Sequence, residues 1–317
     1  MSPRLPDPRQ ARGGLIVVAG EALVDLVQDA SGRLVAHPGG GPFNAARAAG
    51  RLRQPVAFLG PVAGDRFGRQ LRERLARDSV RLDAVVDSER PTTLALAQLD
   101  ARGRVEYRFY AEGTSVPDLS VEAARRALPA GVALLHVGGL GLVFEPIAAA
   151  LEALVRAAAR RAIVTLDPNC RPAAVADATA YRRRLGRVLR HAAVVKASEE
   201  DLAWLDPARP PAETARSLLD QGPALVLLTL GARGATVLTA AGERAVPSPP
   251  VAVRDTIGAG DAFCGAFLAW WRSQGLGRAA LSRPDTAVEA ARFACLVAAR
   301  TCERAGASPP RLSELEA

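Results

Sequence analysis

Short apolar runs alternate with amphipathic stretches along most of this chain. Residues 15–19 form a continuous apolar run that ends at a glycine, a pattern typical of a buried strand. Similar runs predict further buried strands at 56–59, 134–137, 162–166, 193–196 and 225–230. Helical periodicity predicts helices at 43–52, 65–78, 146–160, 178–191, 212–221, 261–272 and 286–302. Strands that alternate with helices favour an α/β fold, with a mostly parallel sheet covered by helices on both faces.

Two segments depart from this alternation of strands and helices. Between residues 92 and 110, apolar and polar residues alternate on either side of a turn at 100–103, which predicts a hairpin in a half-exposed sheet. Residues 235–246 predict a second hairpin. Because the first hairpin interrupts an otherwise βα chain, we expect one α/β domain over 15–317 that carries a small β lid. The lid would comprise residues 92–110 and adjoining N-terminal strands, and residues 1–14 would form a polar tail.

The composition is that of a globular protein with a substantial core. Hydrophobic residues make up 49% and charged residues 23% of the 317 positions, which excludes wholesale disorder, a collagen-like fibre and a disulfide-stapled miniprotein. The polar start lacks the apolar segment of a signal peptide, and the longest apolar stretch, 132–144, is broken by glycines and too short to span a bilayer. The four cysteines form no Cys-x-x-Cys pair. We therefore expect a cytoplasmic protein with reduced cysteines and no membrane partner.

The formal net charge of +8 raises the question of a nucleic-acid partner. Among the 41 basic residues Lys196 is the only lysine, and the arginines are interleaved with acidic residues, as over 66–74. A nucleic-acid footprint needs basic residues that cluster on one face. We therefore expect no nucleic-acid partner.

The strongest chemical signal is the segment Asp-Thr-Ile-Gly-Ala-Gly-Asp at 255–261, a glycine-rich turn that leads into an apolar helix. Small residues let the backbone N–H groups of Gly258, Ala259 and Gly260 approach an anion, and the helix N-terminus adds partial positive charge. Asp261 has two interpretations. It is either a helix cap or a general base held beside a phosphate cradle.

A second glycine turn, at 39–44, opens another predicted helix and ends at Asn44. Alone it is weak evidence, because any tight strand-to-helix loop has this composition and Asn44 is also a common helix cap. The chain has neither the lysine of a Walker A loop after these glycines nor a Gly-x-Gly-x-x-Gly fingerprint there. The usual nucleoside-triphosphatase and dinucleotide motifs are therefore not supported.

Taken together, the two segments resemble the PfkB (ribokinase-like) family of carbohydrate kinases, which has an N-terminal Gly-Gly-x-x-x-Asn and a C-terminal Asp-Thr-x-Gly-Ala-Gly-Asp motif. The resemblance extends from Gly20 to Ala307, with the two motifs in the family's order. It implies a ribokinase-like three-layer α/β/α fold and transfer of the γ-phosphoryl group of ATP to a primary hydroxyl of a sugar. Within the family, residues 20–25 and 167–171 look most like fructokinase and 2-keto-3-deoxygluconate kinase.

The resemblance also implies roles for individual residues. Asp261 would accept the hydroxyl proton, while the N–H groups of 258–260 would stabilise charge on the phosphoryl oxygens. The residues expected to hold the sugar, or the carboxylate of an acidic sugar, are Asp25, Gly40, Gly41, Asn44, Arg108 and Arg171. Those expected to bind ATP are Lys196, Thr229, Gly231, Gly234, Gly258 and Gly260.

Two metal ions are implied in addition to ATP. The family often shows Asn-x-x-Glu at the segment that helps to place Mg²⁺, and here Ser198 and Asp201 occupy those places. The acidic residue for Mg²⁺ is therefore open among 199–201, with Asp201 and Glu200 as the candidates. Asp255 and Ile257 are the candidate K⁺ ligands, although Asp255 is also a common turn residue.

Several functions remain open from the sequence. We expect fructose as the substrate, with 2-keto-3-deoxygluconate as the first alternative. A nucleoside kinase needs an apolar or aromatic slot, and aromatic residues are only 4% of the chain, which favours a sugar. A non-catalytic sugar-binding regulator would need no base at Asp261. The expected partners are a sugar and ATP, and a homodimer through the lid is a further hypothesis.

Overall fold

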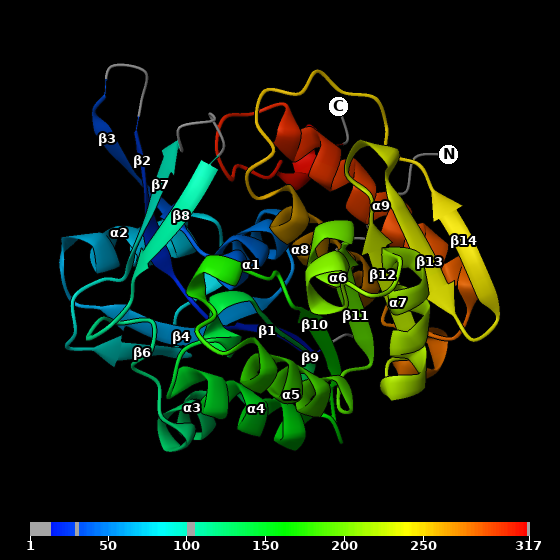
Figure 1. Ribbon diagram of the computed structural model, residues 1–317, viewed down its shortest axis with the longest axis horizontal. Coiled ribbons are helices and arrows are strands. Elements are labelled where there is room, and N and C mark those ends of the chain that lie inside the picture. Colours follow the sequence, from blue (N-terminus) through cyan, green and yellow to red (C-terminus); the bar gives the residue numbers. More distant parts are fainter. Residues whose placement is uncertain (1–13, 29–31, 100–104, 316–317) are drawn as a thin grey trace.

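The computed structural model describes residues 14–28, 32–99 and 105–315, and its centre is a large, mostly parallel sheet (Figure 1). The strands of this sheet are β1 (Leu15–Ala19), β4 (Val56–Ala63), β5 (Val80–Arg81), β6 (Val85–Ser88), β9 (Val132–Gly138), β10 (Ile163–Asp167), β11 (Val194–Ser198), β12 (Leu225–Thr229), β13 (Ala235–Thr239) and β14 (Gly242–Val246). Their order is β14-β13-β12-β11-β10-β9-β1-β4-β5, and β6 pairs with β4. The strands from β12 to β5 run parallel, whereas β13 and β14 form the antiparallel hairpin predicted for 235–246.

Helices cover both faces of this sheet, which confirms the expected three-layer α/β/α fold. One layer contains α1 (Gly41–Arg51), α2 (Arg66–Arg77), α8 (Ala259–Ser273) and α9 (Pro284–Cys302). The other contains α3 (Val121–Ala127), α4 (Ile147–Ala158), α5 (Ala178–Leu189), α6 (Glu199–Leu205) and α7 (Pro211–Leu218), of which α3, α4 and α5 lie along the bottom of Figure 1. Each long helix predicted from the sequence is present, with ends that differ by at most three residues.

The central strands bury both of their faces, which explains why they appear as continuous apolar runs. In β1, Ile16 and Val18 contact the layer of α1 and α8, whereas Val17 and Ala19 contact the layer of α4. All four side chains are fully buried. Burying one such side chain contributes about 1.5–3 kcal/mol.

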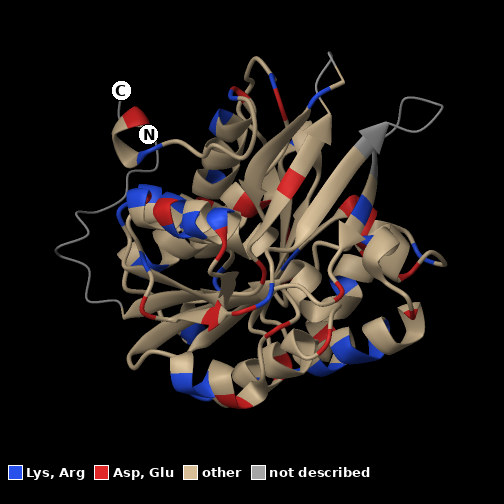
Figure 2. Ribbon diagram, turned by 90° about the vertical axis from the view of Figure 1, so that its left-hand side faces the viewer, with Lys and Arg blue, Asp and Glu red and all other residues tan. Residues whose placement is uncertain are grey.

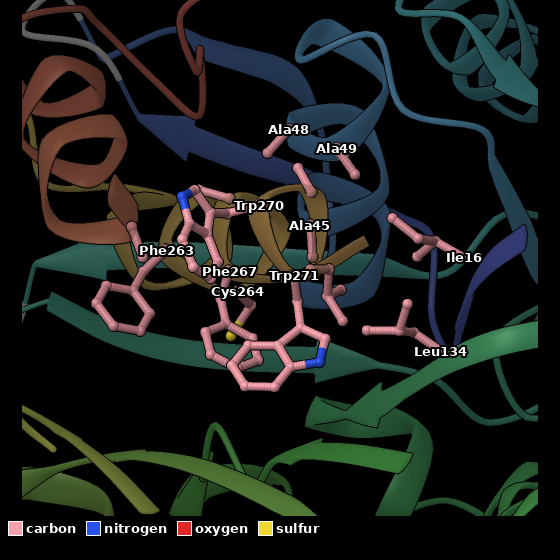
Figure 3. Packing of buried hydrophobic residues seen from close by; sticks show 14 of the residues in the cluster. Ile16, Ala45, Ala48, Ala49, Leu134, Phe263, Cys264, Phe267, Trp270 and Trp271 are labelled. Atoms are coloured by element: carbon pink, nitrogen blue, oxygen red, sulfur yellow. The ribbon is translucent and has the colours of Figure 1, made fainter. Parts of the chain in front are cut away.

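Helices α1 and α8, which carry the two sequence motifs, pack directly against each other (Figure 3). The contact is close because Gly265 has no side chain. A Cβ at this position would lie 2.4 Å from the Ala45 carbonyl oxygen and 2.6 Å from the Ala48 Cβ. The glycine therefore lets the two motifs start side by side at one edge of the sheet.

A smaller sheet stands apart from the large one, at the upper left of Figure 1. It has the order β3-β2-β7-β8 and consists of β2 (Leu23–Gln28), β3 (Leu34–Gly39), β7 (Leu94–Leu99) and β8 (Val105–Tyr110). The pairs β2–β3 and β7–β8 are antiparallel, and β2 and β7 run parallel. This confirms the hairpin predicted for 92–110, although its turn at 100–103 lies outside the described residues.

The predicted tail, 1–14, lies outside the described residues except for Gly14, whose carbonyl oxygen accepts a hydrogen bond from Arg272 Nε at 2.8 Å. Basic and acidic positions interleave along the outer helices, as the sequence indicated (Figure 2). Within the described ranges, no helix combines the length and the apolar character needed to cross a membrane.

Candidate active site

Two adjoining cavities lie at the carboxyl ends of the parallel strands, where α/β proteins usually bind ligands. The larger cavity has a volume of about 800 Å³ and is bordered by β11, β12 and α9. The smaller cavity, of about 320 Å³, lies between the start of α1, the start of α8 and the smaller sheet. Four residues line both cavities, which makes them the boundary between the two: Asn169, Arg171, Thr256 and Gly260.

The turn before α8 forms part of this boundary, and its geometry requires small residues. Gly258 is the N-cap of α8 and has φ 77°, a left-handed conformation that favours glycine. A Cβ at Gly258 would also lie 2.5 Å from the Ala307 Cβ, and one at Gly260 would lie 3.1 Å from Lys196 Nζ. Glycine at these two positions therefore lets the start of α8 pack closely against Ala307 and Lys196. A helix N-terminus offers the N–H groups and partial positive charge that an anion site uses.

Asp261 lies in the first turn of α8, and its carboxylate is held by two side-chain amides. Oδ2 accepts a hydrogen bond from Asn44 Nδ2 at 3.0 Å, and Oδ1 accepts one from Asn169 Nδ2 at 3.3 Å. The helix has no side-chain cap, so Asp261 is not the cap that the sequence left open. Burial raises the pKa of Asp261 to about 6, even though the hydrogen bond from Asn44 lowers it. A carboxyl group with this pKa is ionised at neutral pH and can accept a proton.

Two further carboxyl groups line the smaller cavity. Asp25 comes from β2, and its pKa is raised to about 6 by burial and by the charge of Asp261, with Arg171 acting in the opposite direction. Glu21 follows β1 and is buried. Its two oxygens accept hydrogen bonds from the N–H groups of Gly41 at 3.2 Å and Gly141 at 2.9 Å. Burial raises the pKa of Glu21 to about 7.

Strand β8 contributes an aromatic wall to the smaller cavity. Tyr107 and Phe109 line it, with stacked rings whose centroids are 6.2 Å apart. Arg108 lies between them in sequence and is exposed, and it does not line the cavity. Alternate side chains of a strand point to opposite faces, so the expected contact of Arg108 with substrate is not supported. Arg171, the other predicted arginine, does line the cavity.

The larger cavity is lined by most of the predicted nucleotide-binding residues, namely Lys196, Thr229, Gly231, Gly234 and Gly260. Gly258 lines the smaller cavity instead. Lys196 is buried, and its Nζ lies 2.9 Å from Asp167 Oδ2. Burial disfavours the charged lysine, but the nearby carboxylate of Asp167 outweighs this and raises its pKa. Lys196 therefore carries a positive charge beneath the turn before α8.

Comparison with known proteins identifies the family. The sequence pattern that describes the pfkB family of carbohydrate kinases matches residues 14–314 of this chain. This chain belongs to the PfkB family of carbohydrate kinases. It is accordingly a phosphotransferase whose acceptor is the alcohol group of a sugar.

PfkB relatives of known name resemble the chain over most of its length. A fructokinase of Rhizobium leguminosarum bv. trifolii is 34% identical over 267 residues, which cover 80% of this chain and 79% of that protein. Fructokinase-1 of Oryza sativa subsp. japonica is 33% identical, over 96% of this chain and 97% of that protein.

Solved PfkB structures have the same fold. Fructokinase from Xylella fastidiosa with bound ATP superimposes with a TM-score of 0.88 at 31% identity, covering 95% of this chain and 97% of that one. Fructokinase from Vibrio cholerae O395, in a form with fructose, ADP and calcium bound, has a TM-score of 0.84 at 27% identity, with 96% and 98% covered.

The two residues predicted to bind Mg²⁺ in this PfkB chain, Asp201 and Glu200, differ in how accessible their carboxylates are to an ion. Asp201 is buried, and both of its oxygens accept hydrogen bonds from the protein: Oδ1 from the Cys170 N–H at 2.7 Å, and Oδ2 from the Ser198 N–H at 2.9 Å and the Ser198 hydroxyl at 2.8 Å. Glu200 is exposed and lines the larger cavity. In the part of the chain that the structure describes, no three His, Cys, Asp or Glu side chains converge as a metal site. This donor set suits a magnesium ion bound mainly by phosphates and water, with one carboxylate in reach.

The predicted K⁺ residues lie in the turn before α8. The Asp255 carboxylate accepts hydrogen bonds from the N–H groups of Ile257 at 3.0 Å and Gly306 at 2.7 Å. This is the local turn geometry that the sequence allowed for Asp255. Ile257 is 45% exposed and lines the smaller cavity. The role of these residues as K⁺ ligands stays a prediction.

Sequence reasoning did not single out Glu21 or Asn169, although each lies in a segment that resembled the PfkB family. The available signal for Glu21 was a charged residue two positions after a buried strand, which ends at Ala19. For Asn169 it was the asparagine two residues after β10 ends at Asp167. Its φ of 42° is uncommon for a residue other than glycine.

Proposed function

We propose that this protein is an ATP-dependent fructokinase, which transfers the γ-phosphoryl group to a primary hydroxyl of fructose. The observation that carries the proposal is the position of Asp261, which lines the polar cavity suited to a sugar and directly follows Gly260, a residue that also lines the cavity large enough for a nucleotide. The names and bound ligands of the fructokinase relatives support the same choice.

In this proposal the protein positions the reactants and neutralises charge. ATP would lie in the larger cavity with its phosphates at the turn before α8, where the backbone N–H groups of 258–260 and the helix N-terminus face the transferred group. The sugar would lie in the smaller cavity, with Asp25 and Asn44 on its hydroxyls. Asp261 would take the proton of the attacking hydroxyl, since its carboxylate lies beside that boundary and is ionised near neutral pH.

The charges of the smaller cavity favour fructose over 2-keto-3-deoxygluconate. Its ionisable carboxyl groups are Glu21, Asp25 and Asp261, and Arg171 is the one arginine among its lining residues. The Nη1 of Arg171 already donates to the carbonyl oxygens of Asn169 at 3.2 Å and Cys170 at 3.0 Å. A substrate carboxylate would meet like charges there with little compensation. The hydroxyls of a neutral sugar can instead donate to these carboxylates.

A nucleoside kinase is the second candidate, because the stacked rings of Tyr107 and Phe109 offer one apolar wall on which a base could pack. The other residues that line the smaller cavity include polar side chains, among them Asp25 and Asn44. A sugar with several hydroxyls matches these polar side chains, so fructose remains the preferred substrate.

The proposal also covers the metal ions, the domain organisation, the oligomeric state and the location of the protein. Mg²⁺ would arrive with ATP and lie near Glu200, and K⁺ would bind at the turn of Asp255 and Ile257.

Residues 15–317 would form one kinase domain behind a tail at 1–14, and the smaller sheet would close as a lid. The exposed side chains of Leu34 and Val35 on β3 support a homodimer through this lid. We also propose a cytoplasmic location.

The deciding experiment is a comparison of substrates on one preparation of the protein with ATP and Mg²⁺. The expected result is ADP release with fructose, at a kcat/KM at least about tenfold above those for 2-keto-3-deoxygluconate and a nucleoside, equivalent to about 1.4 kcal/mol in transition-state binding. A tenfold preference for the acid or the nucleoside would replace fructose by that substrate. Saturable fructose binding without ADP formation would indicate a sugar-binding regulator.

A further inference from the structure

Arg47, one turn after Asn44 in α1, is buried beside the smaller cavity and has no part in the chemistry described above. Its guanidinium donates to acceptors from three separate parts of the chain. Nε lies 2.8 Å from Asp78 Oδ2, just after α2, and Nη1 lies 3.0 Å from the Ala307 carbonyl oxygen and 3.4 Å from Asn44 Oδ1. Burial of this charge is costly and lowers the pKa of Arg47, and the carboxylate of Asp78 offsets that cost.

The contact with Asn44 determines which end of that amide faces the catalytic site. Because Asn44 Oδ1 accepts from Arg47, its Nδ2 is turned toward Asp261 Oδ2 and donates to it at 3.0 Å. The reverse orientation would place the amide NH₂ against the donors of Arg47 and the amide oxygen against the Asp261 carboxylate. Both of those contacts are repulsive. Arg47 therefore fixes the donor that holds one oxygen of Asp261.

The contact with Ala307 extends the same effect to the turn before α8. Ala307 packs against Gly258 so closely that a Cβ on Gly258 would lie 2.5 Å from the Ala307 Cβ. The adjacent Gly306 donates its N–H to Asp255 Oδ2 at 2.7 Å. Residues 306 and 307 thus pack against the turn before α8, and the hydrogen bond from Arg47 to the Ala307 carbonyl oxygen connects them to α1.

We infer that Arg47 is a positioning residue for phosphoryl transfer, which aligns the Asn44 amide with Asp261 and braces the turn before α8. The inference rests on the proposed function, in which Asp261 is the base and Asn44 binds the sugar. It predicts that loss of Arg47 affects kcat and the sugar KM while leaving the KM for ATP near its original value.

The test compares Arg47→Lys and Arg47→Gln with Arg51→Gln as a matched control. Arg51 also pairs with Asp78, at 3.1 Å, but its ion pairs reach neither Asn44 nor Ala307. Lysine keeps the charge opposite Asp78 but lacks the planar fork of donors that reaches several acceptors. Both Arg47 variants are expected to lose activity by about 10- to 100-fold, because small displacements of catalytic groups have effects of this size. Arg51→Gln is expected to keep wild-type kcat.

The pH profile adds a readout that a purely structural role would not move. When the Asn44 amide is no longer oriented, Asp261 loses the donor that lowers its pKa, so the acidic limb of kcat should move to higher pH in both Arg47 variants. The other charged groups that act on Asp261 are unchanged in these variants: Glu21, Asp25, Asp167, Arg171 and Lys196.

A double mutant separates action through Asn44 from general damage. In an Asn44→Ala background, Arg47→Lys should cause a smaller loss of kcat than in the wild type, because the amide on which it acts is absent. Additive losses, or Arg47 variants that match Arg51→Gln in kcat and pH profile, would overturn the inference. If Arg47→Gln does not fold, Arg47→Lys carries the same comparison. A wild-type protein that phosphorylates no sugar would instead refute the proposed function.

Discussion

Asn44 Nδ2 donates a hydrogen bond to Asp261 Oδ2 at 3.0 Å, across 217 positions of sequence. Each residue belongs to one of the two motifs that stood out in the sequence, and the fold brings the motifs together at the first turns of α1 and α8. The amide holds the carboxylate in place and favours its ionised form. This contact is the basis of the first two predictions.

Replacing Asp261 by Asn should abolish most of the activity and leave nucleotide binding intact. Asparagine keeps the size of the side chain but cannot accept the hydroxyl proton, and general-base catalysis contributes about 10²–10⁴-fold. The expected result is a fall of this size in kcat, with an ATP dissociation constant close to that of the wild type by calorimetry. Activity within about twofold of wild type, with the same protein preparation, would refute the base role.

The activity should decrease as the pH falls through about 6, the pKa of Asp261 in the folded protein. The sign follows from the role: the base must be ionised, and protonation removes it. In Asn44→Ala the carboxylate loses a stabilising donor, so its pKa rises and the acidic limb of kcat moves to higher pH. The check is kcat against pH at saturating substrates. An acidic limb that stays in place in Asn44→Ala would contradict the assignment.

Asp25→Ala and Asn44→Ala should raise the KM for fructose much more than the KM for ATP. Each loses a hydrogen bond to a sugar hydroxyl, worth about 0.5–1.5 kcal/mol for a neutral pair and more for a charged one. Arg108→Ala is the control, because this side chain lies on β8 but does not line the smaller cavity. Its fructose KM should equal that of the wild type. Equal increases for both substrates in the Asp25 or Asn44 variant would indicate damage to the fold instead.

Potassium should stimulate the reaction if the turn of Asp255 and Ile257 holds a monovalent cation. The measurement is the rate in potassium chloride against the rate in a bulky organic cation at equal ionic strength. Asp255→Asn should reduce the difference, since it removes the negative charge next to the ion. Equal rates of the wild type in the two salts would eliminate the cation site.

Gly265→Ala should destabilise the protein by about 1–3 kcal/mol, the usual effect of overpacking a core contact. The added methyl group would lie 2.4 Å from the Ala45 carbonyl oxygen, so α1 and α8 must move apart. Gly186→Ala in α5 is the matched control, because nothing lies within 4 Å of its Cβ position. That variant should gain about 0.5–1 kcal/mol from the helix propensity of alanine. The measurement is the free energy of unfolding by denaturant; equal stabilities would contradict the close-contact argument.

The sequence was sufficient to predict the long helices and the buried strands, because burial of both sheet faces leaves continuous apolar runs. It did not predict β5, β6, α3 or α6, which have two to seven residues and too few positions for a periodic pattern. Strand β3 also lacks a clear strand pattern in the sequence, because it is mostly exposed and contains Pro38. Proline is tolerated there since β3 lies at the edge of the smaller sheet.

For the site, the motifs located the turn residues and Asp261 but not the groups that meet them from elsewhere. The convergence of Gly41 and Gly141 on Glu21 depends on the positions in space of α1 and of the turn at 139–142 after β9, and no spacing in the sequence encodes it. The same holds for Arg47, whose partners Asp78 and Ala307 come from the residue just after α2 and from the C-terminal segment. Arg108 was assigned to the substrate because it lies in the hairpin, whereas the two-residue period of β8 places it on the other face.

The direct packing of α1 on α8 through Gly265 has a consequence for how such a chain can vary. The amide of Asn44 and the carboxylate of Asp261 lie on two helices that contact each other directly, although 217 positions separate them in the sequence. Length changes in loops that contact neither helix nor these two side chains therefore leave the distance between the two groups unaltered. A single residue inserted into the first turn of either helix would rotate one group by about 100° and separate them.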